Sequence, residues 1–333
     1  MHTPSTYRRA GMTLVELLVV VAILGLLAVT VIPVLSNTAD ARRTREATRL
    51  ITSYIAKAQA RAIGKTEWAG FWLVTSSTNT SVPFAIDMYM ASVPTVYRGD
   101  TTTAKAIVSG STVSWSPSLS IAPSLGDLIR FDGQPPWYEM VSDTTLRLRG
   151  DNSFLGGSTA ADNAGHTSLN TPWPTATAHS FELLRPPRRA GSPITLSDGR
   201  CVDLFWSGYG TSPYTSFGST ASYTSGTPAT TSNVAILFDG TGRLRDVVQG
   251  AARNYAAGPV FLLVGRVDRA GQAMATLSTT NDSLGANWQY SDSFWIAIDP
   301  LSGIAKSAEC KPSAASVVDS QEFIRSEILA TGR

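Results

Sequence analysis

Few residues in this chain have the types and spacing that catalysis needs. His2 lies near the start of the chain, while His166 and His179 lie in or beside polar segments. The sequence contains no H-E-x-x-H, G-x-S-x-G or S-x-x-K motif that would arrange a nucleophile with a base or hold a metal. We therefore predict no catalytic residue, no metal site and no cofactor, and we do not expect an enzyme.

The residue that stands out chemically is Glu16, because it lies inside an apolar run from Gly11 to Leu35. At about 1.5 Å per residue, a helical run of this length can cross the hydrocarbon core of a bilayer. A charged side chain there costs several kcal/mol unless it is paired, so Glu16 is a candidate functional residue. Arg8 and Arg9 precede the run, which predicts that this end stays in the cytoplasm.

Two simpler interpretations of the run compete with a functional one. A secretory signal peptide has an apolar core of about 7–15 residues and a cleavage site after it. Here the core is longer, and residues 36–40 lead directly into a helical pattern. A plain membrane anchor fits the composition, but it does not explain a carboxylate five residues after a glycine at the membrane edge.

The segment from Arg9 to Glu16, R-A-G-M-T-L-V-E, resembles the processing site of type IV prepilins and of type II secretion pseudopilins. The resemblance implies that a prepilin peptidase cuts after Gly11 and methylates the new amino terminus at Met12. It also implies that Glu16, fifth in the mature chain, supports filament assembly, and that Pro33 is the proline common late in the apolar helix of this family. Phenylalanine is commoner than methionine at the mature start.

Composition is compatible with a secreted, β-rich head. Hydrophobic residues make up 43% and charged residues 16%, and the net charge of +2 argues neither for nor against nucleic acid as a partner. Cys201 and Cys310 form no C-x-x-C motif. With the chain exported, a disulfide is plausible and two buried thiols are the alternative; we predict the disulfide.

Residues from Ala39 to about Gly64 have helical periodicity. Apolar residues recur at steps of three and four and form one stripe: Ala47, Leu50, Ile51, Tyr54, Ile55, Ala58 and Ala62. Basic residues at 42–49 occupy other faces; we favour a solvated face over nucleic-acid binding, with lipid head groups as a further possible contact. The membrane helix is therefore expected to continue outward and to lie with this stripe against a sheet.

The rest of the chain alternates short β-type runs with turns, so the predicted fold class is α+β: a long N-terminal helix packed on a β-rich head of antiparallel strands. We divide the chain into a leader (1–11), the helix (12–64, with 12–35 transmembrane), the first strands of the head (65–92), an inserted β-rich module (93–185) and the C-terminal part of the head (186–333). A strand, turn and strand pattern from Ile236 to Leu244 and an I-D-P-x-S-G segment resemble minor pseudopilins of the GspH/FimT type.

Taken together, these patterns predict a structural minor subunit of a type IV pilus or type II secretion pseudopilus. Its expected partners are prepilin peptidase, other pilin or pseudopilin subunits and the inner membrane. The expected location is a single pass through the inner membrane, with the head in the periplasm or on an extracellular filament. The alternative is a binding module at the filament tip, with DNA, a glycan or an exported protein as its ligand.

Overall fold

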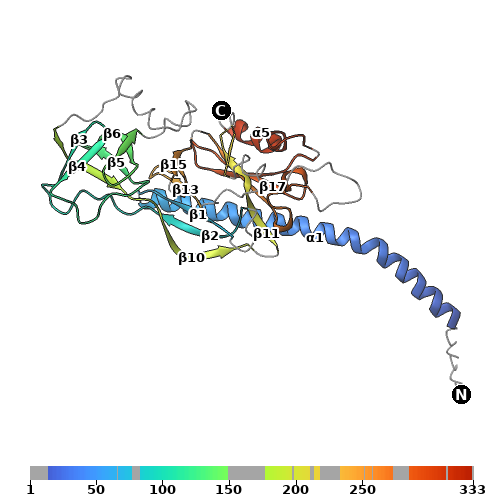
Figure 1. Cartoon of the computed structure of the whole chain (residues 1–333). Coiled ribbons are helices and arrows are strands. Elements are labelled where there is room, and N and C mark those ends of the chain that lie inside the picture. Colours follow the sequence, from blue (N-terminus) through green and yellow to red (C-terminus); the bar gives the residue numbers. More distant parts are fainter. Residues whose placement is uncertain are drawn as a thin grey trace, which may run out of the picture.

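The computed structural model describes residues 14–65, 67–76, 83–148, 177–196, 199–210, 214–217, 233–250, 252–256, 258–272, 285–312 and 314–331. Side chains of residues 27–39 lie outside this description. The described chain is α+β, with an N-terminal helix and a large body of antiparallel strands, as predicted. Figure 1 shows the helix leaving the body at one end and the small sheets lying at the other.

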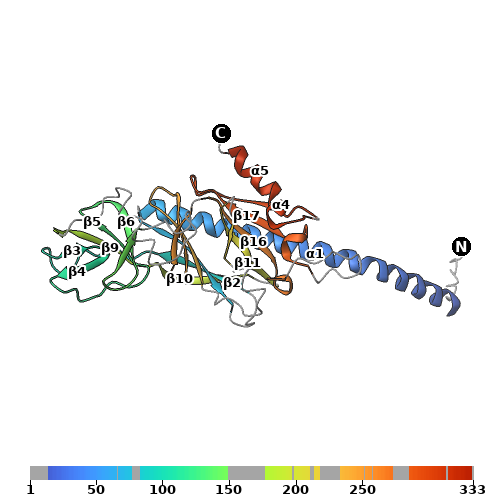
Figure 2. The same cartoon turned by 45° about the horizontal axis from the view of Figure 1, so that its top comes forward.

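A single helix, α1 (Leu14–Lys65), covers 52 residues. Its first half projects from the body, and its second half lies along the main sheet (Figure 2). The helix ends one residue after Gly64, close to the predicted stop. Within the part of the chain that is described, no helix is long and apolar enough to cross a membrane. The predicted transmembrane segment, 12–35, extends past the side chains that the description covers.

The main sheet has eleven strands, and its central path runs β15-β14-β13-β1-β2-β11-β16-β17-β18, with β10 beside β2 and β12 beside β11. The strands are β1 (Ala69–Thr75), β2 (Phe84–Ser92), β10 (Arg188–Thr195), β11 (Arg200–Tyr209), β12 (Thr215–Ser216), β13 (Val234–Phe238), β14 (Leu244–Gln249), β15 (Ala252–Tyr255), β16 (Val260–Arg266), β17 (Phe294–Ile298) and β18 (Ala305–Glu309). The predicted hairpin from Ile236 to Leu244 is confirmed as β13 and β14, paired antiparallel.

One face of this sheet packs against the second half of α1 and forms the largest hydrophobic core. Six of the seven predicted stripe residues are buried there. Leu50 is the exception, with 42% of its surface exposed. It lies 100° around the helix from Ile51, so it falls outside the contact face. Thr44 and Thr48 lie on that face instead, and each donates its buried hydroxyl to the carbonyl four residues earlier.

The opposite face of the sheet is covered by C-terminal segments: the short helices η1 (Val267–Arg269), η2 (Asn287–Gln289), α4 (Val317–Ser320) and α5 (Glu322–Thr331). A second core forms there around Trp288, Trp295 and Phe261. The predicted amphipathic segment at 317–330, a short helix or a loose tail, is helical over α4 and α5.

Residues predicted as an inserted module form two small sheets. The order in one is β4-β3-β8, and in the other β7-β6-β5-β9. The strands are β3 (Lys105–Ser109), β4 (Thr112–Ser116), β5 (Leu128–Phe131), β6 (Gln134–Met140), β7 (Leu146–Leu148), β8 (Ala178–His179) and β9 (Phe181–Leu184). They enclose their own core, and a further cluster that includes Leu128, Leu184 and Leu237 joins them to the main sheet. The exact limits of the module, 93 and 185, stay a prediction.

Candidate assembly site

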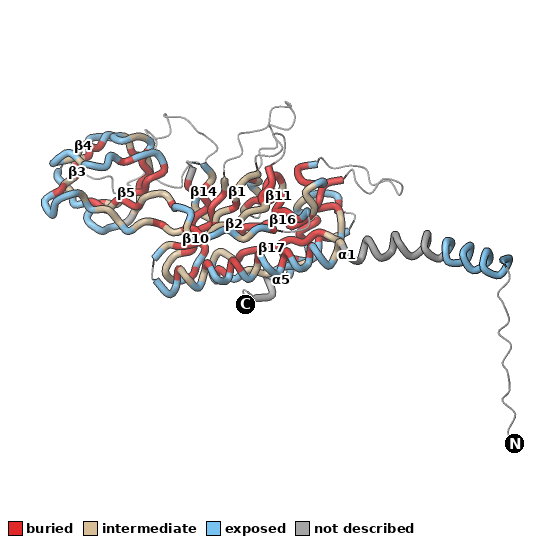
Figure 3. Tube along the Cα trace, turned by 90° about the horizontal axis from the view of Figure 1, so that it is seen from below, coloured by how far each residue is buried: buried red, intermediate tan, exposed pale blue. Residues whose placement is uncertain are grey.

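From Leu14 to Leu26, α1 exposes its apolar side chains on every side. All residues from Leu14 to Leu26 are exposed (Figure 3). Ten of them are large hydrophobic residues, and their exposed fractions range from 42% for Val20 to 80% for Leu14. A helix that is apolar all around is stable only inside a protein bundle or a membrane. No described part of the chain covers the segment, so we expect lipid or other helices to cover it.

Glu16 lies in the first turn of α1, among these exposed apolar side chains. A carboxylate near the N-terminus of a helix interacts favourably with the helix dipole. That interaction alone does not remove the cost of covering the charge with lipid or apolar side chains. Covering the segment therefore makes the charge of Glu16 costly unless a cation lies close to it.

The other residues predicted for processing and assembly cannot be compared with the structure at side-chain level. Gly11 and Met12 lie outside the described residues, as does the whole predicted leader. Pro33 falls within α1, but its side chain is among those not described. Their roles stay predictions.

The head holds the second half of α1 with apolar contacts and with a polar contact near its C-terminal end. Ile51, Ile55, Ala58 and Ala62 are completely buried against the sheet. Between Ala58 and Ala62, Gln59 donates its side-chain amide to the carbonyl oxygens of Gly242, at 2.9 Å, and Ser302, at 2.7 Å. One glutamine thus fastens the helix to the β13–β14 and β17–β18 turns.

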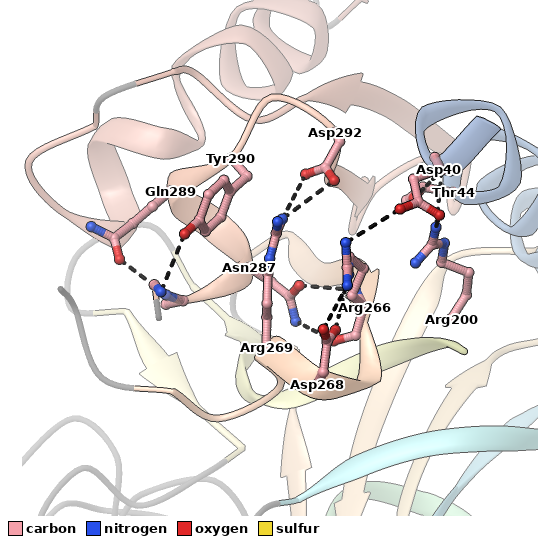
Figure 4. A network of polar contacts seen from close by, with 12 residues as sticks. Asp40, Thr44, Arg200, Arg266, Asp268, Arg269, Asn287, Gln289, Tyr290 and Asp292 are labelled. Carbon is pink, nitrogen blue, oxygen red and sulfur yellow. Dashed lines mark hydrogen bonds and ion pairs between the residues drawn. The ribbon is translucent and has the colours of Figure 1, made fainter. Parts of the chain in front are cut away.

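Where α1 leaves the head, a cluster of ion pairs centres on Asp40. Figure 4 shows Arg200 and Arg266 directed at its carboxylate from the sheet. The Arg200 guanidinium lies 2.7 Å from Oδ1 and is only 3% exposed, and that of Arg266 lies 3.3 Å from Oδ2. Arg43, one turn along the helix, lies 3.4 Å from Oδ1. A single carboxylate therefore forms ion pairs with three arginines, two of which come from the sheet.

The cluster continues from Arg266 across the sheet. Arg266 also pairs with Asp268 at 2.6 Å, and this bond raises the pKa of Arg266. Burial raises the pKa of Asp268, but the hydrogen bond and charge of Arg266 outweigh it and hold that pKa below the usual value. The Arg266 backbone N–H donates to Asn287, whose amide returns a bond to the Arg266 carbonyl. The exit of α1 is thus fixed to the covering segment on the opposite face.

Asn287 links this cluster to a second, fully buried carboxylate, Asp203. Its amide donates to Asp203 at 3.1 Å, and Gly271 N–H donates to the same oxygen. Burial raises the pKa of Asp203 to about 6, although these hydrogen bonds oppose the shift. Gly265 permits the arrangement, because a Cβ there would lie 2.3 Å from the Asn287 side-chain oxygen.

Four arginines follow Asp40 on one side of α1, and we call Arg42, Arg43, Arg45 and Arg49 the arginine collar. All four are exposed. Arg45 lies 3.1 Å from Glu309, in a pair whose side chains are about half exposed. Within the described residues, Arg42 and Arg49 form no ion pair.

The predicted disulfide between Cys201 and Cys310 is wrong. Both cysteines are free and buried, and they belong to different core clusters. Cys201 on β11 pairs with Gly265 on the neighbouring strand β16. The backbone N–H of Cys310 donates a hydrogen bond to the carbonyl of Ser293, which lies immediately before β17, two strands from β11. The two thus lie three strand spacings apart, roughly 14 Å, whereas a disulfide needs Cα atoms within about 7 Å. Burial raises the pKa of both thiols, so neither is a ready nucleophile.

Asp40 is the central residue of a cluster that sequence patterns do not predict, and the other members Arg200, Arg266 and Asn287 are not predicted either. Its arginine partners are 160 and 226 residues away in the chain, and only the strand order brings them together. A single aspartate that follows an apolar run has no local sequence pattern that distinguishes it from a solvent-exposed residue.

Comparison with family models identifies the N-terminal segment. Residues 6–32 match the model of the prokaryotic N-terminal methylation motif. The chain thus carries the prepilin-type motif of type IV pilin-like proteins and pseudopilins, as predicted. The motif implies processing by prepilin peptidase and assembly with other pilin subunits. Comparisons with curated proteins and with solved structures found no match. The resemblance to GspH/FimT-type subunits stays a prediction.

Proposed function

We propose that this protein is a structural, non-catalytic minor subunit of a type IV pilus or a type II secretion pseudopilus. The observation that carries the proposal is the exposed apolar segment of α1 from Leu14 to Leu26, which lies within the methylation motif at residues 6–32. Full burial of a large apolar side chain stabilises by about 1.5–3 kcal/mol, so ten half-exposed ones represent on the order of 10 kcal/mol. Packing this half among the equivalent helices of neighbouring subunits would recover that free energy in a filament.

Before assembly, the same segment is proposed to cross the inner membrane once. Arg8 and Arg9 hold the leader in the cytoplasm, and residues 12–35 form the span. The head then lies in the periplasm, and on the filament after assembly. The apolar surface of α1 would thus be covered by lipid before assembly and by the helices of neighbouring subunits after it.

Glu16 is proposed to pair with the amino group of Met12, most simply that of an adjacent subunit. That amino group is a free cation only after the leader is cut. A carboxylate that must be covered by apolar helices needs such a partner. Leader removal would then act as the switch for assembly, because it creates the charge that Glu16 requires.

The test compares Glu16→Ala with a matched control, Glu46→Ala, which removes an exposed carboxylate from the same helix outside the apolar run. Each variant is quantified in membranes and in sheared filaments. We expect Glu16→Ala to reach the membrane normally and to fall at least tenfold in filaments, since an unpaired amine then remains among apolar helices. Glu46→Ala should enter filaments like the unmodified chain. Normal incorporation of Glu16→Ala would contradict the proposal.

A second function, binding at the filament tip, is favoured by the place of the two small sheets. They lie at the end of the body opposite the N-terminus of α1 (Figure 1). A subunit held by α1 would therefore carry them farthest from the membrane, where an exported protein, a glycan or DNA could be met. An epitope inserted at Gly110, in the open β3–β4 turn, tests this by immunogold labelling. Label at filament ends supports the tip; label along the shaft contradicts it.

A further inference from the structure

The arginine collar has an exposed positive charge that the head does not neutralise. Over residues 40–49, α1 carries four arginines and two carboxylates, Asp40 and Glu46, which leaves a net charge of 4 − 2 = +2. Asp40 pairs with Arg200 and Arg266 of the sheet and with Arg43 of the collar. The Arg45–Glu309 pair is half exposed, and pairs of this kind contribute little. The outward surface of this helical segment is therefore basic.

Arg42 and Arg49 of the collar face away from the sheet, whereas Arg43 pairs with Asp40 and Arg45 pairs with Glu309 of β18. At 100° per residue, Arg42 and Arg49 lie about 180° and 160° around α1 from the buried Ile51. Neither has an ion-pair partner among the described residues, and both are exposed. Their guanidinium groups are thus available to a partner outside the chain.

The distance between the collar and the apolar run of α1 indicates what that partner is. Arg42 follows Leu35, the last residue of the apolar run, by seven residues, or about 10 Å of helix. Helical side chains lean toward the N-terminus, here toward the apolar segment. The guanidinium groups of Arg42, Arg43 and Arg45 therefore come within reach of the head-group layer if residues 12–35 span the bilayer. Arg49, one turn further out, lies within about a Debye length of that layer.

We propose that the arginine collar binds the phosphates of anionic lipids in the outer leaflet of the inner membrane, and so holds the head at a fixed height before assembly. This inference rests on the proposed membrane span. Guanidinium groups suit such a partner because they bind phosphate oxygens bidentately and remain charged at all physiological pH values. Extraction into a filament must break these contacts, so anionic lipid opposes extraction and neutral lipid does not.

The experiment uses the full chain in phosphatidylcholine vesicles that contain a trace of spin-labelled phosphatidylglycerol or spin-labelled phosphatidylcholine. Electron spin resonance gives the fraction of each lipid that the protein immobilises. We expect phosphatidylglycerol to be preferred by roughly threefold or more at low salt, since each arginine near a charged lipid surface attracts it. The ratio of immobilised phosphatidylglycerol to immobilised phosphatidylcholine should approach one in 1 M NaCl, where the Debye length falls to about 3 Å.

Paired variants identify the residues responsible. Arg42→Gln with Arg49→Gln should reduce the preference at least by half. The control, Lys57→Gln with Arg188→Gln, removes two exposed charges elsewhere and should leave it unchanged. Equal tryptophan fluorescence of the variants checks that the head is folded.

Two outcomes overturn the inference, and they differ from each other. If the chain resists alkaline extraction but immobilises both lipids equally, lipid binding by the arginine collar is contradicted and the membrane span is not. The same holds if the control variant loses the preference for phosphatidylglycerol. A chain recovered in the aqueous phase contradicts the proposed span, and the lipid contact with it.

Discussion

The two halves of α1 differ in what covers them, although they form one uninterrupted helix. From Leu14 to Leu26 every residue is exposed, and the residues are apolar on all sides except at Glu16. From Thr44 to Ala62 one stripe is buried against the sheet, and charged residues occupy the other faces. The second half is stabilised by its own head, while no described part of the chain covers Leu14 to Leu26. One helix thus combines a folding element with a segment that the described head leaves uncovered, which we propose to be the assembly element.

This division assigns stability and assembly to separate residues. Core contacts between α1 and the sheet stabilise the head whether or not the apolar half is covered. Contacts made by the apolar half contribute only when lipid or other helices surround it. Substitutions in the two halves should therefore affect different measurements, and the polar cluster at Asp40 marks the boundary between them.

The largest expected effect comes from a buried residue of the second half. Ile55 is completely buried, so Ile55→Ala should lower the free energy of unfolding of the head by about 2–5 kcal/mol. Leu24, with 59% of its surface exposed, is the matched residue of the first half. Leu24→Ala should change the unfolding free energy by less than about 0.5 kcal/mol. Denaturant unfolding of the detergent-solubilised chain, followed by tryptophan fluorescence, measures both. Equal losses in the two variants would show that the halves are not separate.

A smaller effect is expected at the boundary. Asp40→Asn removes the negative charge that pairs with Arg200. The Arg200 side chain is 3% exposed, so its guanidinium is left nearly buried without a carboxylate partner. The unfolding free energy should fall by about 1–3 kcal/mol. Glu46→Gln, which removes an exposed carboxylate six residues later, is the control and should have almost no effect. If both variants unfold at the same denaturant concentration as the unmodified chain, the Asp40 cluster does not hold the helix to the head.

Local patterns predicted much of this architecture. The helical stripe, the stop near Gly64 and the β13–β14 hairpin follow from residues close together in the sequence, where periodicity and turn chemistry decide the outcome. Leu50 lies four residues from Tyr54 and so fits the periodic pattern, but its position on the helix falls beyond the contact face and it is exposed.

Long-range pairing could not be predicted in the same way. Cys201 and Cys310 both fall in the C-terminal part of the head, which favours a disulfide from the sequence alone, but the strand order places β16 and β17 between them. The arginines around Asp40 come from β11 and from the end of β16, and neither strand has a sequence signal for a partner on α1. Strand order, and not local periodicity, determines these contacts.

The measurement that tests the central claim most directly is the mass of the amino-terminal peptide of the protein isolated from membranes. The account predicts a mature chain that begins at Met12, carries one methyl group on its amino terminus and retains the apolar half of α1. A chain cleaved near Ala39, which would release a head without that half, would contradict the account, and so would a chain that keeps residues 1–11.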